Sequence, residues 1–240
     1  MSGKTERRED LGNGIFVTVN SLFSFGTDAL LLAEFAQECA PRAKRAVDLG
    51  TGCGVIPLLW AKKSFPVEMD ALELQPEGAA LACRSVEENG LSHRIRVQCA
   101  DLRLPVLPAG VFDLVACNPP YFPSGAGGIS PVPERNHARA EDQLALTELC
   151  TATARLLKNG GKFCLCHRTE RMASVMYALC SAGLTPKKLQ MVRTSPLREP
   201  KLFLLCAVRG GGEGLAILPE KTTWRKENAG NIDGSRNTDW

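Results

Sequence analysis

The chain has 240 residues, of which 44% are hydrophobic and 23% charged, and this composition is typical of an ordinary globular protein with an ample core. The net charge of +3 neither requires a nucleic-acid partner nor excludes one at a local basic patch. The N-terminal segment is charged, no apolar run could span a membrane, and the ten cysteines include no paired Cys-x-x-Cys units. We therefore expect a cytoplasmic protein with no membrane or metal partner, whose cysteines are packing residues.

The first 40 residues are predicted to form an N-terminal extension. The first ten are polar and are expected to fray. The pattern over residues 14–25 predicts two short strands around Asn20-Ser21. Thr27 is predicted as the N-cap of a helix rich in Ala and Leu, with Asp28 in its first turn.

Residues 41–209 alternate predicted strands and helices. Strands are predicted at Arg45–Asp48, Val67–Leu74, Ile95–Cys99, Phe112–Cys117, Lys162–Cys166, Lys188–Val192 and Leu202–Val208. Helices are predicted at about 54–63, 76–89, 141–158 and 170–182. The connection between the last two strands is too short for a helical crossover, so that pair should be antiparallel. We expect an α/β, Rossmann-like fold with a mostly parallel seven-stranded sheet, one antiparallel strand, and helices on both faces.

Two segments fall outside this alternation. Residues 123–136 are rich in Gly and Pro, and are predicted to be a loop over a site or a disordered insertion. Residues 210–240 are Gly-rich and then polar, and are predicted to be a flexible tail in which only LAILPE is apolar enough to dock.

Three glycines follow the first strand of the alternating region. Gly50, Gly52 and Gly54 would let the backbone approach a ligand and would expose N–H groups at a helix start. Val55 stands where the dinucleotide fingerprint needs Gly or Ala. Asp48 makes the loop less favourable for a pyrophosphate and better suited to the ammonium group of an amino-acid ligand.

Further acids end the next two strands. Glu73 can accept both hydroxyls of a ribose, and Asp101 can accept a hydrogen from an adenine amine. Each acid alone would also suit a helix cap or a turn. Because open α/β sheets bind ligands beyond the carboxyl ends of their strands, the three acids together predict a nucleoside-plus-amino-acid cofactor. S-adenosylmethionine has those parts.

Asn118-Pro119-Pro120-Tyr121 closes the fourth strand of the alternating region. The prolines cannot continue a central strand, and they hold the backbone around the Asn extended. The Asn118 carboxamide and a neighbouring carbonyl can bind a planar –NH2 group from two sides, while Tyr121 can stack on it. A lone motif of this kind would also suit a plain strand-ending turn. Beside the cofactor residues, it favours an amine on a flat heteroaromatic or amide as substrate.

The chain resembles the class I S-adenosylmethionine-dependent methyltransferases, because VDLGTGCGVIPLLWA, LELQ, CAD and CNPPYF occur in that order. With FSFGTDALLLAEFA upstream and NHARAED downstream, residues 14–208 are similar to the bacterial valine-tRNA adenine-N6 methyltransferase family. The resemblance implies the Rossmann-like methyltransferase fold and methylation of the exocyclic amine of a tRNA adenine beside the anticodon. One residue departs from the family pattern, since Ala140 stands where the family commonly has His.

The resemblance also implies the site residues. Target-amine contacts would come from Asn118, Pro119, Pro120 and Tyr121. Cofactor contacts would come from Thr27, Asp28, Asp48, Gly50, Thr51, Gly52, Glu73, Leu74, Asp101, Leu102 and Asn118. The expected partner is tRNA, with ribosomal RNA possible, and contacts are expected at scattered basic residues: Arg7, Arg8, Arg42, Lys44, Arg45, Lys62, Lys63, Arg94, Arg96, Arg135, Arg139, Arg198 and Lys201.

Other functions stay open at this point. The Asn-Pro-Pro-Tyr motif also fits guanine-N2 methylation in ribosomal RNA and protein-glutamine N5 methylation, although the glutamine enzymes usually carry an additional N-terminal helical domain. A small-molecule target is another alternative. A different class of function is a non-catalytic adapter of the same fold that binds RNA or a protein.

Overall fold

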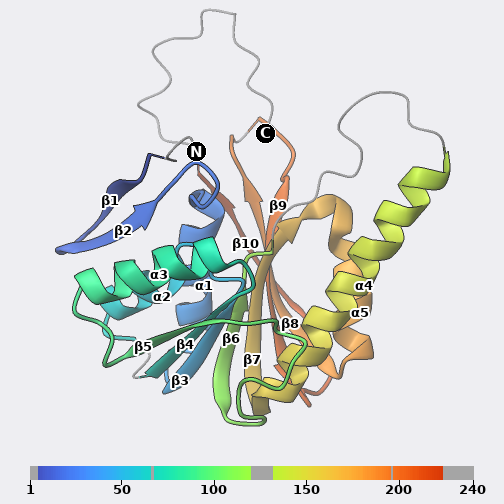
Figure 1. Cartoon of the computed structure of the whole chain (residues 1–240). Helices are drawn as coiled ribbons and strands as arrows, with labels where there is room; N and C mark the ends of the chain where they lie inside the picture. The colour runs from blue at the N-terminus through green and yellow to red at the C-terminus, as the bar shows by residue number, and fades with distance from the viewer. Residues whose placement is uncertain (1–4, 66–67, 120–131, 196, 224–240) are drawn as a thin grey trace, which may run out of the picture.

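Eight strands form the central sheet of the protein (Figure 1). In chain order they are β3 (Arg45–Leu49), β4 (Glu68–Glu73), β5 (Ile95–Cys99), β6 (Phe112–Cys117), β7 (Leu157–Arg168), β8 (Leu184–Arg193), β9 (Leu202–Arg209) and β10 (Ala216–Thr222). The computed structural model describes residues 5–65, 68–119, 132–195 and 197–223, with the backbone alone for residues 132–143.

The strand order in the sheet is β10-β8-β9-β7-β6-β3-β4-β5. Neighbouring strands pair in parallel, except that β9 runs antiparallel to both β7 and β8. The predicted mostly parallel, Rossmann-like methyltransferase sheet with one antiparallel strand is therefore confirmed, but the sheet has eight strands rather than seven.

The additional strand, β10, comes from the segment predicted as a polar tail. It pairs in parallel with β8, with Ile217 opposite Leu189. Leu218 packs against the core, whereas Ile217 is 64% exposed. Because this strand is Gly-flanked and half exposed, its composition resembles that of a loop, and the sequence pattern did not reveal it.

Helices cover both faces of the sheet (Figure 1). One face carries α1 (Thr27–Cys39), α2 (Val55–Lys62) and α3 (Pro76–Glu88), and the other carries α4 (Val132–Leu156) and α5 (Met172–Ser181), which follows a 3-10 turn at Thr169–Arg171. Alternate side chains of β6 reach the two layers, because Leu114 and Ala116 belong to the first core and Val115 and Cys117 to the second. No helix of the described residues is long and apolar enough to cross a membrane.

The N-terminal hairpin differs from its prediction. Strand β1 (Arg7–Gly12) pairs antiparallel with β2 (Ile15–Val19), so the strands do not flank Asn20-Ser21. Asn13 and Gly14 form the turn, with φ of 58° and 75°. Asn-Gly is a preferred pair for a two-residue hairpin turn with positive φ. This pair indicated a hairpin, although the residues before it are polar and were predicted to fray.

The hairpin packs on α3. The Thr18 N–H donates to the Ser85 hydroxyl at 2.9 Å, and the Phe16 N–H donates to the Asn89 side-chain oxygen at 2.9 Å. Side chains of α3 and of the residue that follows it thus accept hydrogen bonds from two backbone N–H groups of β2, which a third strand would otherwise do.

Two helix starts were predicted wrongly. Gly26, which is extended with φ −108° and ψ −179°, is the N-cap of α1, whereas Thr27 is the first helical residue. Asp28 lies in the first turn as predicted. Helix α4 begins at Val132, nine residues before the predicted start at Glu141. The predicted start was too late because residues 123–136, which are rich in Gly and Pro, were predicted to be a loop or an insertion.

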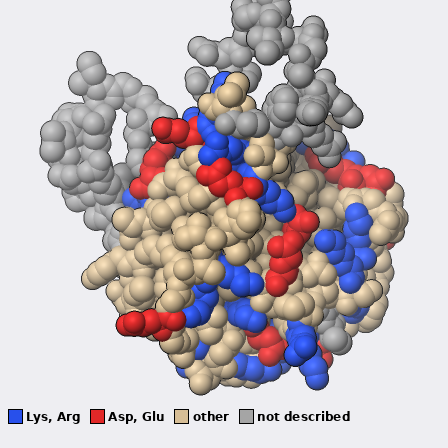
Figure 2. All heavy atoms as spheres, turned by 180° about the vertical axis from the view of Figure 1, so that it is seen from behind, with Lys and Arg blue, Asp and Glu red and all other residues tan. Residues whose placement is uncertain are grey.

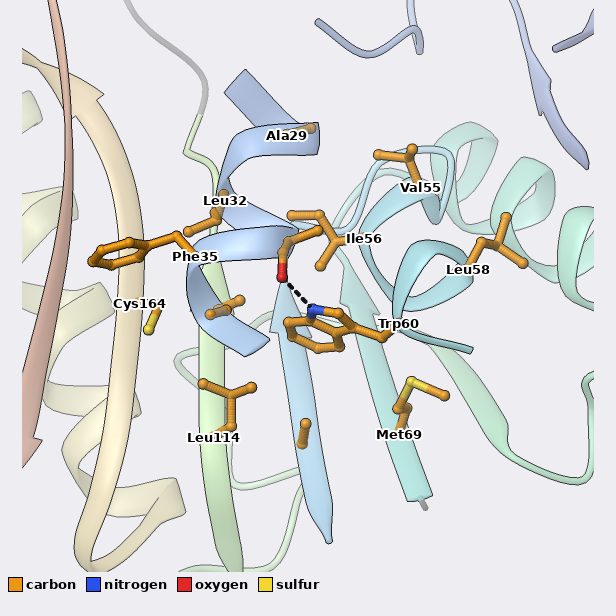
Figure 3. Packing of buried hydrophobic residues seen from close by; sticks show 14 of the residues in the cluster. Ala29, Leu32, Phe35, Val55, Ile56, Leu58, Trp60, Met69, Leu114 and Cys164 are labelled. Carbon is orange, nitrogen blue, oxygen red and sulfur yellow. Dashed lines mark hydrogen bonds between the residues drawn. The ribbon is translucent and has the colours of Figure 1, made fainter. Parts of the chain in front are cut away.

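Trp60 joins α2 to α1 in the core between these helices and the sheet (Figure 3). Its ring is 1% exposed, and its indole N–H donates to the Ala33 carbonyl oxygen at 3.0 Å. Phe65 packs edge-on against it, with ring centroids 6.2 Å apart. The indole therefore fixes the position of α1 relative to α2.

We expect Trp60→Ala to lower the free energy of unfolding by about 3–5 kcal/mol, because it leaves a large cavity in a close-packed core. Urea denaturation followed by circular dichroism measures this. Tyr177, which is 70% exposed, supplies the control: Tyr177→Ala should stay within about 0.5 kcal/mol of the parent. Similar midpoints for both variants would contradict the assigned role of Trp60.

Candidate cofactor and target-amine site

The predicted site residues meet at one edge of the sheet, where its topology reverses. From β3 the chain moves outward through β4 and β5, and then returns to the opposite side of β3 as β6. Such a switch point leaves a crevice beyond the carboxyl ends of the strands, where α/β proteins bind ligands. Asp48 lies opposite Ala116 in the β3–β6 ladder, so Asn118 comes two residues after the residue that pairs with Asp48.

The glycine loop between β3 and α2 is fixed by backbone hydrogen bonds. The Gly50 and Thr51 N–H groups donate to the Leu72 carbonyl oxygen at 2.8 and 2.9 Å. Gly50 and Gly52 have φ of 72° and 56°, and a Cβ on either would meet nothing within 4 Å. The loop therefore presents bare backbone to open space, as close approach of a ligand requires.

Asp48 is the most unusual acid at this edge. Its side chain is buried, with 1% exposure, and neither carboxylate oxygen has a hydrogen-bond partner among the described residues. Burial raises the pKa of Asp48 to about 7; the Thr51 hydroxyl opposes this rise, and the negative charge of Glu73 adds to it. A buried carboxylate without a partner fits a cationic ligand group such as an ammonium.

Glu73 is held by two backbone donors. The Gly52 N–H donates to Oε2 at 2.8 Å, and the Gln75 N–H donates to Oε1 at 2.9 Å. Each carboxylate oxygen can accept a second hydrogen bond, so this orientation fits the two hydroxyls of a ribose. Leu74, the next residue, is 61% exposed beside it and offers an apolar surface.

Asp101 follows β5 and bonds to Arg103. The Arg103 guanidinium donates to Oδ2 from Nε at 2.9 Å and from Nη2 at 2.5 Å. These bonds lower the pKa of Asp101 and keep it an acceptor. Leu102, between the two, packs against the second core. The sequence reasoning missed Arg103, although an arginine two residues after an acid in a turn was the available signal.

Asn118 and Asp28 are in contact across 90 residues of sequence. The Asn118 side-chain nitrogen donates to Asp28 Oδ2 at 3.0 Å. Asn118 and Pro119 are half-buried, and Thr27 is exposed. Pro120, Tyr121 and most of segment 123–136 lie outside the described residues. The structure therefore places Asp28 beside the predicted target-amine residue.

A side chain at Gly78 would disturb this site. Its Cβ would lie 2.6 Å from Phe23 Cε1 and 3.0 Å from Glu73 Cγ. We expect Gly78→Ala to weaken S-adenosylmethionine binding about tenfold or more, because crowding of this kind costs about 1–3 kcal/mol. Titration calorimetry measures the Kd, and Cys83→Ala on the same helix is the control. Equal affinities would show that crowding at Gly78 does not reach the cofactor site.

Three cysteines cluster in the core away from these acids. The sulfurs of Cys39, Cys164 and Cys206 all lie within 4.8 Å of one another, and all three residues are buried. Burial raises the pKa of Cys164 well above its ordinary value. Cys164 and Cys166 face the same core, as predicted. A protonated thiol in such surroundings behaves as a small hydrophobic group.

Several of the predicted basic contacts are engaged in ion pairs. Arg7 pairs with Glu9 at 2.7 Å, and Arg96 and Arg45 both reach Asp70, at 2.7 and 3.5 Å. Figure 2 shows basic and acidic side chains interspersed over one face of the molecule. Arg135 and Arg139 have no described side chains. The positive charge over these residues is thus partly neutralised by local acids.

Residues 13–180 match the family model described as the methyltransferase small domain. The chain therefore belongs to this methyltransferase family. It is an S-adenosylmethionine-dependent N-methyltransferase, as predicted, and the Asp48 and Glu73 carboxylates at the switch point fit the ammonium and ribose of that cofactor.

Two relatives carry the name tRNA1(Val) (adenine(37)-N6)-methyltransferase. The protein from Porphyromonas gingivalis strain W83 is 30% identical over 185 residues, which is 75% of this chain and 72% of that protein. The protein from Enterobacter sp. strain 638 is 34% identical over 143 residues, which is 58% of this chain and 56% of that protein. The chain is similar to both.

Solved structures share the fold. A predicted O-methyltransferase from Agrobacterium tumefaciens has a TM-score of 0.63 and 24% identity, covering 82% of this chain and 88% of that one. TrmN from Thermus thermophilus has a TM-score of 0.58 and 23% identity, covering 81% of this chain and 55% of that one.

Proposed function

We propose that this enzyme methylates the N6 amine of an adenine in tRNA, beside the anticodon. The observation that carries the proposal is the half-buried Asn118, which directly follows β6 at the switch point where the unpartnered Asp48 carboxylate also lies. The relatives named as tRNA1(Val) adenine-N6 methyltransferases support the same acceptor. A tRNA substrate also agrees with the cytoplasmic location expected from the sequence.

Four groups would hold the cofactor. Asp48 would bind the ammonium group, Glu73 the ribose hydroxyls and Asp101 the adenine amine, while the bare backbone at Gly50 and Gly52 would let the ligand approach. Leu74 and Leu102 would supply apolar contacts to the adenine. S-adenosylmethionine supplies an electrophilic methyl group on a sulfonium sulfur.

The target amine would be held by Asn118 and Pro119. The Asn118 carboxamide oxygen and the Pro119 carbonyl would each accept one hydrogen of the adenine –NH2, which turns the nitrogen lone pair out of conjugation with the ring. Orientation of two reactants can supply on the order of 7–11 kcal/mol of the barrier. One amine proton leaves to water after the new nitrogen–carbon bond has formed, so the site needs no strong base.

The acceptor base must be accessible outside a stacked helix. An adenine amine inside a stack cannot reach the Asn118 carboxamide, so the enzyme needs a flipped or looped-out nucleotide. An anticodon loop supplies such a base. Tyr121 would stack on the base, and this role remains a prediction from the sequence.

A radiolabelled methyl-transfer assay tests the proposal. Purified enzyme and labelled S-adenosylmethionine are incubated separately with unmodified tRNA, ribosomal RNA and a protein fraction, and the products are digested to nucleosides or amino acids. We expect label in N6-methyladenosine from valine tRNA. Label in N2-methylguanosine from ribosomal RNA, or in N5-methylglutamine, would overturn the acceptor. A protein that binds no S-adenosylmethionine in calorimetry and labels no fraction would be an adapter.

A further inference from the structure

The contact between Asp28 and Asn118 assigns a role to Asp28 that differs from cofactor binding. We propose that Asp28 is a positioning residue, which fixes the Asn118 carboxamide so that its oxygen is turned toward the target amine. The observation is the bond from Asn118 Nδ2 to Asp28 Oδ2 at 3.0 Å. The inference deepens the proposed function and rests on it, since it concerns how the same acceptor amine is held.

The chemistry of the two groups determines which end of the amide faces Asp28. An ionised carboxylate only accepts hydrogen bonds, whereas a carboxamide has one acceptor oxygen and one nitrogen with two hydrogens. The opposite amide orientation would bring the Asn118 oxygen against a carboxylate oxygen, which is repulsive. Asp28 therefore holds the nitrogen, and the oxygen lies at the other end of the planar carboxamide.

A target –NH2 group makes this orientation important. The amine offers hydrogens, so it requires the Asn118 oxygen and is repelled by the Asn118 nitrogen. Without Asp28, the two amide orientations would compete within one site. In one of these orientations the Asn118 –NH2 group would face the target –NH2 group, and both groups are hydrogen-bond donors. The target amine would then not be held in the position that methyl transfer requires.

Asp28 itself is held firmly at the start of α1. Its Oδ1 accepts the Ala29 N–H at 2.9 Å, and a carboxylate is favoured at a helix N-terminus. Ala29 and Leu32 of the same helix are buried, with 3% and 0% exposure (Figure 3). A Cβ on Gly26 would lie 2.7 Å from Oδ1, so the glycine leaves room for the carboxylate in this position.

Kinetics of Asp28→Ala and Asp28→Asn test the role. We expect Asp28→Ala to lower kcat for methyl transfer roughly 10- to 100-fold, which is the scale of a misplaced reacting group. The Kd for S-adenosylhomocysteine should stay within threefold. Glu38→Ala removes an exposed carboxylate from the same helix and should leave both values unchanged. If Asp28→Ala does not fold, Asp28→Asn keeps the size and shape, and should lower kcat less strongly.

A nuclear magnetic resonance measurement supplies a readout that does not depend on activity. The side-chain –NH2 signals of Asn118, assigned by their loss in Asn118→Ala, should shift in Asp28→Ala and Asp28→Asn but not in Glu38→Ala. Unshifted signals, an unchanged kcat, or a tenfold weaker Kd with kcat intact would overturn the inference. Failure of the proposed function is distinct, because the parent enzyme itself would then label no adenine in tRNA.

Discussion

Asn118→Ala is expected to lower kcat for methyl transfer by about 100- to 1000-fold, the usual effect of removing one preorganised hydrogen-bonding group from a reaction centre. The carboxamide is an uncharged side chain just after β6 that can accept one hydrogen of the target amine, beside the Pro119 carbonyl. Affinity for S-adenosylmethionine should change only a few-fold, because Asp48 and Glu73 remain.

Single-turnover transfer to valine tRNA and calorimetry with S-adenosylhomocysteine measure the two quantities. Asn159→Ala, at an exposed position in β7, is the matched control and should retain parental kcat. An active Asn118→Ala enzyme would exclude the proposed amine contact. If weaker cofactor binding accounted for all of the lost rate, the role of Asn118 would be to bind the cofactor and not the target amine.

Affinity for S-adenosylmethionine is expected to rise between pH 5 and pH 8. Burial raises the pKa of Asp48 from 3.8 to about 7, so below pH 7 most of the carboxyl groups are protonated and cannot balance an ammonium. Binding should therefore release close to one proton at pH 6 and almost none at pH 8. Calorimetry in buffers with different ionisation enthalpies counts these protons.

The same shift has a consequence for the stability of the ligand-free protein. Between pH 3.8 and about 7 the folded state binds more protons than the unfolded state, so stability falls as the pH rises through this window, by a few kcal/mol at most. Asp48→Asn removes this dependence. We expect the variant to be more stable than the parent at pH 8, with little difference near pH 4, and to bind S-adenosylmethionine about 30-fold or more weakly.

Urea denaturation at pH 4, 6 and 8 measures the stability difference. Asp113→Asn is not a suitable control, because that carboxylate accepts the Lys44 and Arg45 N–H groups. Glu38→Gln, at an exposed helical position, is suitable. A stability gap between parent and Asp48→Asn that is constant with pH would contradict a raised pKa at Asp48.

Strands that lie between clear turn residues could be predicted from the sequence more closely than the other elements. Strands β5 and β6 have the predicted bounds, since each lies between clear turn residues. The partly exposed strands β1 and β10 were missed, because their residues do not show the contrast between apolar and polar faces on which such predictions depend.

The site was predictable where its residues follow strand ends, and not where it depends on contacts between distant segments. Asp48, Glu73 and Asn118 follow from strand order alone. The bond between Asp28 and Asn118 joins residues 90 positions apart, and no spacing in the chain reveals it. The crowding around Gly78 also involves a distant segment, since Phe23 reaches it from before α1.

Strand β10 affects how readily the sheet could pair with a strand of another molecule. It occupies the border of the sheet beyond β8, where exposed backbone donors would otherwise recruit another polypeptide. Pro219 removes one donor from that border, and the flanking Glu220 and Lys221 are tied to Arg193 and Glu34. The segment that looks least structured in sequence thus closes the open side of the sheet against intermolecular strand addition.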